Sequence, residues 1–72
     1  MHENWEKLAH AVILRAVEDY RAARRRLQRS PDQKGAQATI REVEKFFRSS
    51  YFAQLTDLDP EYLIQRLKEE AA

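Results

Sequence analysis

The chain has no cysteine and only one glycine and two prolines among its 72 residues. Without cysteine it can form neither a disulfide nor a thiolate metal site, and a single glycine excludes a glycine-rich phosphate loop. The longest uncharged apolar run, Ala11 to Leu14, is far shorter than the roughly 20 residues of a membrane helix. The start, Met1-His2-Glu3, has no basic region followed by an apolar stretch, as a signal peptide would. We therefore expect a cytoplasmic protein without membrane association.

The formal net charge is only +1, yet the charges are distributed unevenly. Residues 1–34 carry eight Lys or Arg and five Asp or Glu, whereas residues 35–72 carry five and seven. Between Tyr20 and Lys34, six basic residues accompany a single acid, Asp32. The sequence thus predicts a basic segment near the middle of the chain and an acidic C-terminal part.

Apolar residues recur every three or four positions from Trp5 to Leu27, which is the pattern of one face of an amphipathic helix. No glycine or proline interrupts residues 1–30, so we expect one helix over about 4–29, roughly 39 Å long at about 1.5 Å per residue. A compact domain of this size has a radius of gyration of about 11 Å, so a rod of that length spans or overhangs the rest of the chain.

Ser30-Pro31 ends this pattern, because proline disfavours a helical conformation at the residue before it. Residues 30–33 form a candidate capping box for a second helix that starts between residues 31 and 36. The Ser49-Ser50 pair either ends that helix near residue 48 or bends it on to residue 55. Asp59-Pro60-Glu61 indicates the start of a last helix over about 60–70.

Two long helices joined by a short polar loop form an antiparallel hairpin, and a third helix must cover the apolar seam that remains open. The predicted fold is therefore an all-α, three-helix bundle, a single domain over residues 1–72 with helices at about 4–29, 33–48/55 and 60–70. Adjacent helix positions diverge by about 100°, so the sequence leaves open whether Phe46 and Phe47 are both buried. Because each buried aromatic removes about 150 to 250 Å² from water, we expect much of the core to come from five of them: Trp5, Phe46, Phe47, Tyr51 and Phe52.

Residues suited to catalysis are few. The only imidazoles are those of His2 and His10, and Glu6 with His10 offers just two ligands on one helix, too few for a closed metal site. The serines fall at expected helix ends, where they fit capping roles. A thin helical bundle also has little room for a concave site. We therefore expect no enzyme activity, no metal and no cofactor.

The basic segment provides the candidate binding site. On a helix, Arg21, Arg25 and Arg29 are spaced i, i+4 and i+8 and form one ridge, with Arg24 on its core-side flank and Arg26 on the opposite flank. Such a ridge could follow a phosphate backbone. Equally, cations at a helix C-terminus complement the helix dipole without binding a partner. The residues predicted to bind nucleic acid or a protein partner are Arg21, Arg24, Arg25, Arg29 and Lys34.

Leu14 is a candidate apolar interface. It falls more than a quarter-turn from the main apolar stripe, on the side of Lys7 and Glu18. With Ala11 and Ala22 it offers a strip that a second copy or another protein could cover, although single exposed leucines are normal on protein surfaces.

Three stretches of the chain carry a family resemblance: Ala16-Val17-Glu18-Asp19-Tyr20-Arg21, Val43-Glu44-Lys45-Phe46-Phe47-Arg48-Ser49-Ser50-Tyr51-Phe52 and Leu55-Thr56-Asp57-Leu58-Asp59-Pro60-Glu61-Tyr62-Leu63-Ile64. Together they resemble a family of small uncharacterised proteins encoded in prophages and integrative elements of Gram-positive bacteria. The family pattern often has Trp where Tyr51 stands and Gly where Pro60 stands, and both changes fit the same structural roles. The resemblance implies a phage or mobile-element origin and a bacterial host cell, and it carries over no catalytic residue.

Small cofactor-free proteins of such elements commonly act by stoichiometric binding, including the blocking of host defence complexes. The resemblance therefore implies a non-enzymatic protein that binds a protein or nucleoprotein target, with a CRISPR effector as one candidate. Either the arginine ridge or the acidic C-terminal face would contact the target. Two alternatives stay open: a DNA- or RNA-binding accessory factor that uses the ridge, and a helical protein that forms a homodimer through Leu14 or the aromatic residues around Tyr51.

Overall fold

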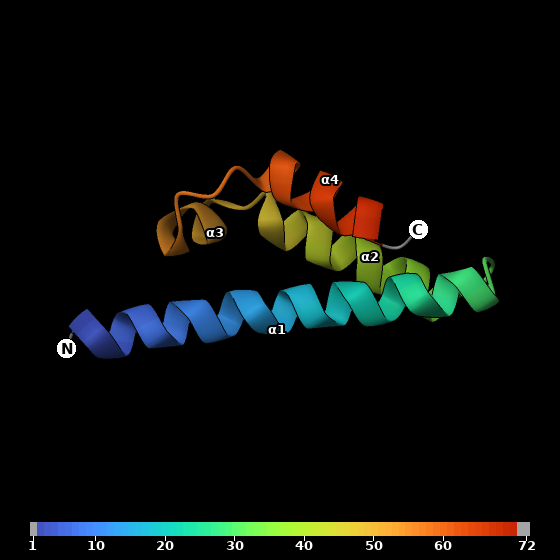
Figure 1. Cartoon of the computed structure of the whole chain (residues 1–72), viewed down its shortest axis with the longest axis horizontal. Coiled ribbons are helices and arrows are strands. Elements are labelled where there is room, and N and C mark those ends of the chain that lie inside the picture. The colour runs from blue at the N-terminus through green and yellow to red at the C-terminus, as the bar shows by residue number, and fades with distance from the viewer. Residues whose placement is uncertain (1, 71–72) are drawn as a thin grey trace.

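The computed structural model describes residues 2–70, with side chains from Asn4 onward, and all regular secondary structure in that range is α-helical. Figure 1 shows the first helix running the length of the molecule, with the rest of the chain folded back along one side of it. The longest extent, 43 Å, matches the roughly 42 Å expected for its 28 residues. The predicted all-α fold is confirmed. The helices are α1 (His2–Arg29), α2 (Lys34–Phe47), α3 (Ser50–Leu55) and α4 (Pro60–Glu70).

A four-residue loop, 30–33, joins α1 to α2 in an antiparallel hairpin. The Gln33 amide donates to the Ser30 carbonyl at 3.0 Å, and the Gln37 side chain donates to the Pro31 carbonyl at 2.9 Å. The predicted capping box over residues 30–33 is wrong, because the N-cap of α2 is Gln33, whose side chain makes no capping bond. The chain uses residues 30–33 for the turn itself, so the helix starts one turn later than the box requires.

Ser49 separates α2 from α3. Its backbone is extended, its Oγ accepts a hydrogen bond from the Phe52 amide at 3.2 Å, and its hydroxyl donates to the Phe46 carbonyl at 2.6 Å. One side chain therefore caps the free Phe52 amide at the start of α3 and adds a second donor to the Phe46 carbonyl, which also accepts from the Ser49 amide at 3.0 Å. The second of the three expected helices is thus divided, which gives four helices within residues 2–70.

The predicted start of the last helix is confirmed. Asp59 accepts a hydrogen bond from the Glu61 amide at 3.0 Å through its carboxylate, and Pro60 is the first residue of α4. Proline costs nothing at this position, because the amide it lacks would have no partner within the helix. This cap fixes where α4 begins to pack on the hairpin.

The core joins all four helices around three fully buried aromatic side chains, Tyr20, Phe47 and Phe52. The Phe47 and Phe52 rings lie 5.4 Å apart, edge to face, and the Tyr20 and Phe47 rings lie 6.2 Å apart. Phe46 is only half-buried, so the two adjacent phenylalanines have different environments. The buried cluster consists of Val17, Tyr20, Phe47, Phe52, Ile64 and Leu67.

The expectation that Trp5 and Tyr51 belong to the core is wrong, because they are 51% and 50% exposed. The six residues of α3 cover too little of the N-terminal half of α1 to enclose Trp5. Tyr51 precedes Phe52 on the same short helix, and positions about 100° apart cannot both face the core. Tyr20, which is fully buried, occupies the central position instead.

Candidate functional site

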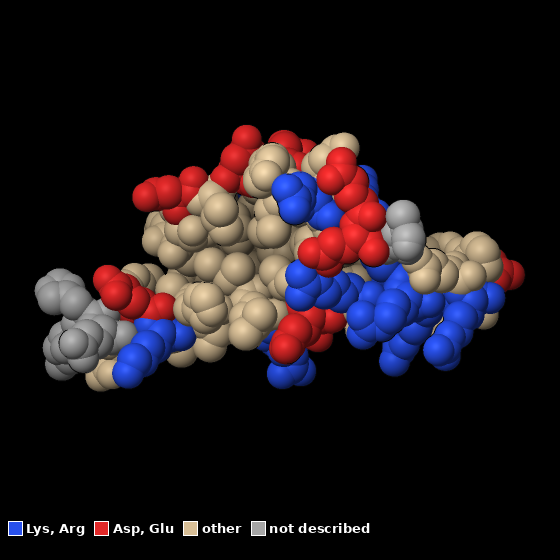
Figure 2. Space-filling model, in the orientation of Figure 1, with Lys and Arg blue, Asp and Glu red and all other residues tan. Residues whose placement is uncertain are grey.

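Four of the five predicted site residues lie on the C-terminal half of α1, and the fifth, Lys34, is the first residue of α2 across the loop. Figure 2 shows Lys and Arg side chains gathered along this half of α1. The uninterrupted helix carries these side chains away from the aromatic core toward one end of the molecule. The structure then divides them into two groups by what they contact.

Arg21 and Arg24 are held by the last turn of α4. The Arg21 guanidinium donates to both carboxylate oxygens of Glu70, from Nε at 2.7 Å and from a terminal nitrogen at 2.9 Å. Arg24 donates to the Lys68 carbonyl at 3.2 Å, and its buried Nε has no hydrogen-bond partner among the described residues. These two arginines therefore dock α4 on α1, a role that the ridge pattern did not predict.

The pairing of Arg21 with Glu70 shifts the pKa values of both side chains. The hydrogen bond to Glu70 raises the pKa of Arg21, and the hydrogen bond from Arg21 lowers the pKa of Glu70. Both side chains remain nearly half exposed, so solvent and salt screen the attraction between them. A competing anion could take the place of Glu70 on Arg21 at small cost.

The remaining cations of the region form no ion pair with any side chain described in residues 4–70. They are Arg25, Arg26, Arg29 and Lys34, and all four are exposed. We call this group the basic end. The helical spacing places Arg26 on the flank of the ridge opposite Arg24, and the predicted site does not include it. Arg26 stays exposed on that flank although Thr39 and Glu42 of α2 line the same hollow, and its position in the last turn of α1 was the available signal.

The basic end also has a role in stability. Arg26 and Arg29 occupy the last turn of α1, where positive charge complements the partial negative charge of the free carbonyls. This contribution accounts for a preference for arginine here but requires no particular orientation of the side chains. The same charges are therefore available to an external anion.

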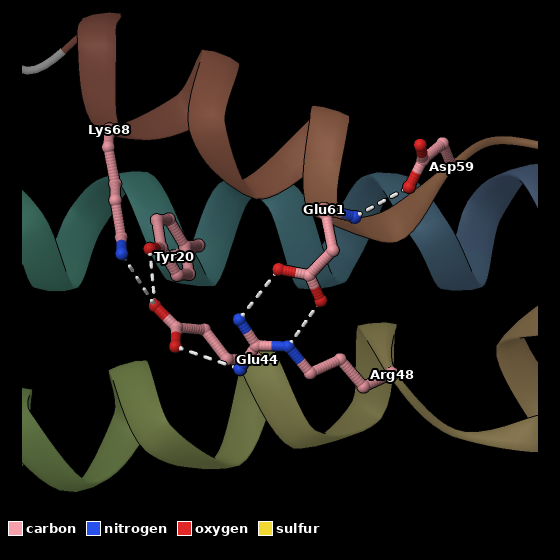
Figure 3. Close-up of polar contacts among 6 residues, drawn as sticks. All are labelled: Tyr20, Glu44, Arg48, Asp59, Glu61 and Lys68. Carbon is pink, nitrogen blue, oxygen red and sulfur yellow. Dashed lines mark hydrogen bonds and ion pairs between the residues drawn. The ribbon is translucent and has the colours of Figure 1, made fainter.

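A polar network among α1, α2 and α4 fixes the position of α4 on the hairpin (Figure 3). The buried Tyr20 hydroxyl donates to Glu44 at 2.8 Å, and Arg48 contacts the same carboxylate at 3.4 Å. Arg48 also donates two hydrogen bonds to Glu61 of α4, at 2.6 and 3.0 Å. The Lys68 ammonium lies 4.0 Å from Glu44. Because Tyr20, Glu44 and Glu61 come from three helices, the network sets where α4 sits and hence where Glu70 meets Arg21.

Burial and the acceptor Glu44 determine the protonation of Tyr20. Desolvation first, and then the hydrogen bond to the carboxylate, raise the pKa of the Tyr20 phenol well above its usual value of 10.0. The hydrogen bonds from Arg48 lower the pKa of Glu61. At neutral pH Tyr20 is therefore a neutral donor and Glu61 an anion, and their hydrogen bonds hold α4 against the hairpin as a structural strut.

Leu14 is 45% exposed, as its position off the apolar stripe predicts. Figure 2 shows an uncharged surface between α1 and the segment that contains α3 and the start of α4. A role for Leu14 as an interface stays a prediction. Among the residues with described side chains, no group of three or more His, Cys, Asp or Glu could hold a metal ion, and the side chain of His2 lies outside them.

Comparison of the chain with protein-family profiles, with curated proteins and with solved structures finds no match in any of the three. Within the described range, no helix is both long enough and apolar enough to cross a membrane.

Proposed function

We propose that the protein is a non-enzymatic binding protein that acts stoichiometrically, and that its basic end contacts nucleic-acid phosphates within a nucleoprotein target. The observation that carries the proposal is the absence, among the side chains of residues 4–70, of any ion pair to Arg25, Arg26, Arg29 and Lys34. The nearby Arg21 and Arg24 are both engaged by α4. Four cations without an ion pair at one end of the hairpin concentrate positive charge that attracts an anion.

The spacing of these side chains suits a phosphate backbone. Arg25 and Arg29 are one helical turn apart, about 6 Å along the α1 axis, and the phosphates of one duplex strand rise by about 3.4 Å each along the duplex axis. The ridge can therefore contact more than one phosphate of a single strand. Contacts from all four cations would give a slope of log affinity against log salt of about −3.6 on duplex DNA. With a net charge of only +1, the affinity for free nucleic acid is modest, which favours a nucleoprotein that adds protein contacts.

The resemblance to proteins of prophages and integrative elements supports a target in the cytoplasm of a bacterial host, with a CRISPR effector as one candidate. The motif residues that carry the resemblance have structural roles here: Phe47 and Phe52 fill the core, and Ser49 and Asp59 cap helices. They therefore support a shared fold and leave the contact with a target to surface residues such as those of the basic end.

The acidic C-terminal part is less suited to contact a target. Glu61 is bound by Arg48 and Glu70 by Arg21, Asp59 caps α4, and Glu69 accepts a hydrogen bond from Gln65 at 3.4 Å. Most of its carboxylates are thus used within the fold, which argues against the hypothesis that this face imitates a nucleic-acid backbone.

Fluorescence anisotropy with labelled single- and double-stranded DNA and RNA, titrated with salt, tests the proposal. The variant Arg25→Glu/Arg29→Glu should lose binding while it stays helical, with a melting temperature lowered only by the loss of the helix-dipole contribution of Arg29. The matched control is Arg41→Glu/Lys45→Glu, which makes the same charge change at two exposed positions one turn apart on α2. Equal losses in both variants would reduce the effect to net charge, and no binding by the wild type at low salt would contradict phosphate contact.

A further inference from the structure

One face of the α1–α2 hairpin has no helix over it. The hairpin meets α4 through Arg21 of α1 and through Glu44 and Arg48 of α2. Phe46 lies two residues from Glu44, about 160° away around α2, and therefore points to the other side of the hairpin. On that side a shallow groove is lined by apolar side chains of both helices. They are the half-buried Val12, Ala16, Val43 and Phe46.

Apolar surface extends the groove at one end. Leu8 lies one turn before Val12 on α1 and is 56% exposed. The ring of Tyr51, which is half exposed, lies 6.1 Å from that of Phe46. Single exposed apolar side chains are ordinary on protein surfaces, but a contiguous set beside an apolar groove indicates a contact surface. We call the groove together with Leu8 and Tyr51 the open face.

The accessible surface of the chain is larger than a folded monomer of its mass should have. It amounts to 5604 Å², whereas the scaling for monomeric proteins gives about 4,700 Å² at 8.6 kDa. The difference of about 900 Å² is close to the roughly 800 Å² that each partner buries in a stable interface. The radius of gyration, 13.1 Å, also exceeds the value of about 11 Å for a compact chain of this length.

The charges at the edge of the open face favour a copy of the same chain over a nucleic acid. The groove is bordered by one cation, Arg15, and by two acids, Asp19 and Glu42, and a neighbouring hollow adds Arg26 beside the same acids. Two carboxylates at the edge would repel phosphates. A mixed edge with both signs is self-complementary, as a two-fold interface requires.

We propose that the open face is the interface of a homodimer, in which two α1 helices pack antiparallel about a two-fold axis. The groove side chains Val12 to Asp19 are centred on the midpoint of α1, so an axis there lets the two helices overlap along their whole length. In this arrangement Leu8 of one copy lies over the hollow that the half-buried Ala22 and Val43 of the other line. The two basic ends then lie at opposite ends of the dimer. This proposal does not depend on phosphate binding.

Sedimentation equilibrium of the full chain, from micromolar to millimolar concentration, provides the test. We expect the wild type to reach twice 8.6 kDa. Leu8→Lys should weaken association about tenfold or more, while circular dichroism stays unchanged. The matched control is Leu14→Lys, which alters an equally accessible leucine about 120° away on the same helix and should leave the dimer intact. A wild type that remains monomeric, or a dimer that Leu14→Lys disrupts, would overturn the proposal.

A second measurement, disulfide cross-linking, tests the interface without replacing an apolar side chain of the groove. The chain contains no cysteine, so a single introduced thiol can only form a disulfide between two copies. Arg15 lies next to the proposed axis and its side chain is 79% exposed. Arg15→Cys should therefore oxidise rapidly to a disulfide-linked dimer, and Leu14→Cys should not. Equal rates for the two variants would contradict an axis at this face.

Discussion

Glu70 accepts two hydrogen bonds from the guanidinium of Arg21, at 2.7 and 2.9 Å, across 49 positions of the chain. Under the proposed phosphate binding, this contact places a carboxylate on the arginine ridge where a phosphate would compete for Arg21. The ion pair is partly exposed and hence easily exchanged. It makes α4 a competitor for one end of the ridge.

Removal of that competitor should increase phosphate binding. In Glu70→Gln, Arg21 loses its charged partner and becomes available, so the affinity for DNA should rise. The salt dependence should steepen by up to about 0.9, the contribution of one further phosphate contact. Anisotropy titrations at several salt concentrations measure both quantities. Glu69→Gln removes the neighbouring exposed carboxylate, which contacts no arginine in the described part of the chain, and serves as the control. Equal gains in the two variants would mean that only net charge changed.

Loss of the Tyr20 hydroxyl should destabilise the fold. Tyr20→Phe removes a 2.8 Å hydrogen bond to the partly buried carboxylate of Glu44, and hydrogen bonds to charged groups contribute about 1.5 to 3 kcal/mol. We expect the free energy of unfolding in urea to fall by an amount in that range. Tyr62→Phe is the matched control, since the Tyr62 ring is exposed and its hydroxyl contacts only Arg66, at 3.1 Å, among the described residues. An equally large fall in the free energy of unfolding of the control would contradict a stabilising role of the Tyr20–Glu44 hydrogen bond.

The cap between α2 and α3 should contribute measurably. Ser49→Ala removes the acceptor of the Phe52 amide and a donor to the Phe46 carbonyl, and loss of an N-cap costs about 1 kcal/mol. The melting temperature should fall accordingly. Ser50→Ala, one residue later and on the exposed side of α3, should change it little. If both variants melt like the wild type, Ser49 does not hold this joint.

Stability should decrease in acid because of two carboxylates. The pKa values of Glu61 and Glu70 are lowered in the folded state by the hydrogen bonds from Arg48 and Arg21, relative to an ordinary value of 4.5. Between those values the unfolded chain binds more protons than the folded one, so the free energy of unfolding falls as the pH drops. The contribution is complete above the ordinary pKa and disappears below the lowered ones. Thermal melts followed by circular dichroism across this range measure the effect, and Arg21→Gln should make the fall shallower.

The sequence predicts the helices well, because the signals that decide them are local. The three- and four-residue periodicity gives α1 its length, Pro31 stops it, and Asp59-Pro60 starts α4. The predicted capping box at residues 30–33 is wrong because serine and proline favour turns as readily as helix starts, and here they form the turn. At Ser49 the local sequence is compatible with either a helix end or a bend in a continuous helix. The packing of Phe52 on Phe47 favours the helix end that is observed.

The contacts of the candidate site could be predicted only in part from the periodicity of the sequence. The ridge of arginines follows from spacing on one helix, and the exposure of Leu14 follows from the same geometry. The sequence could not foresee that Arg21 meets Glu70 and that Arg24 meets the Lys68 carbonyl, because each contact joins residues more than 40 positions apart. Nor could the sequence show that Arg26, like Arg25, forms no ion pair among the described side chains. The sequence alone therefore determined the elements and the distribution of charge. The direction in which α4 crosses the hairpin decided which charges are used within the fold, which stay unpaired, and which apolar face stays uncovered.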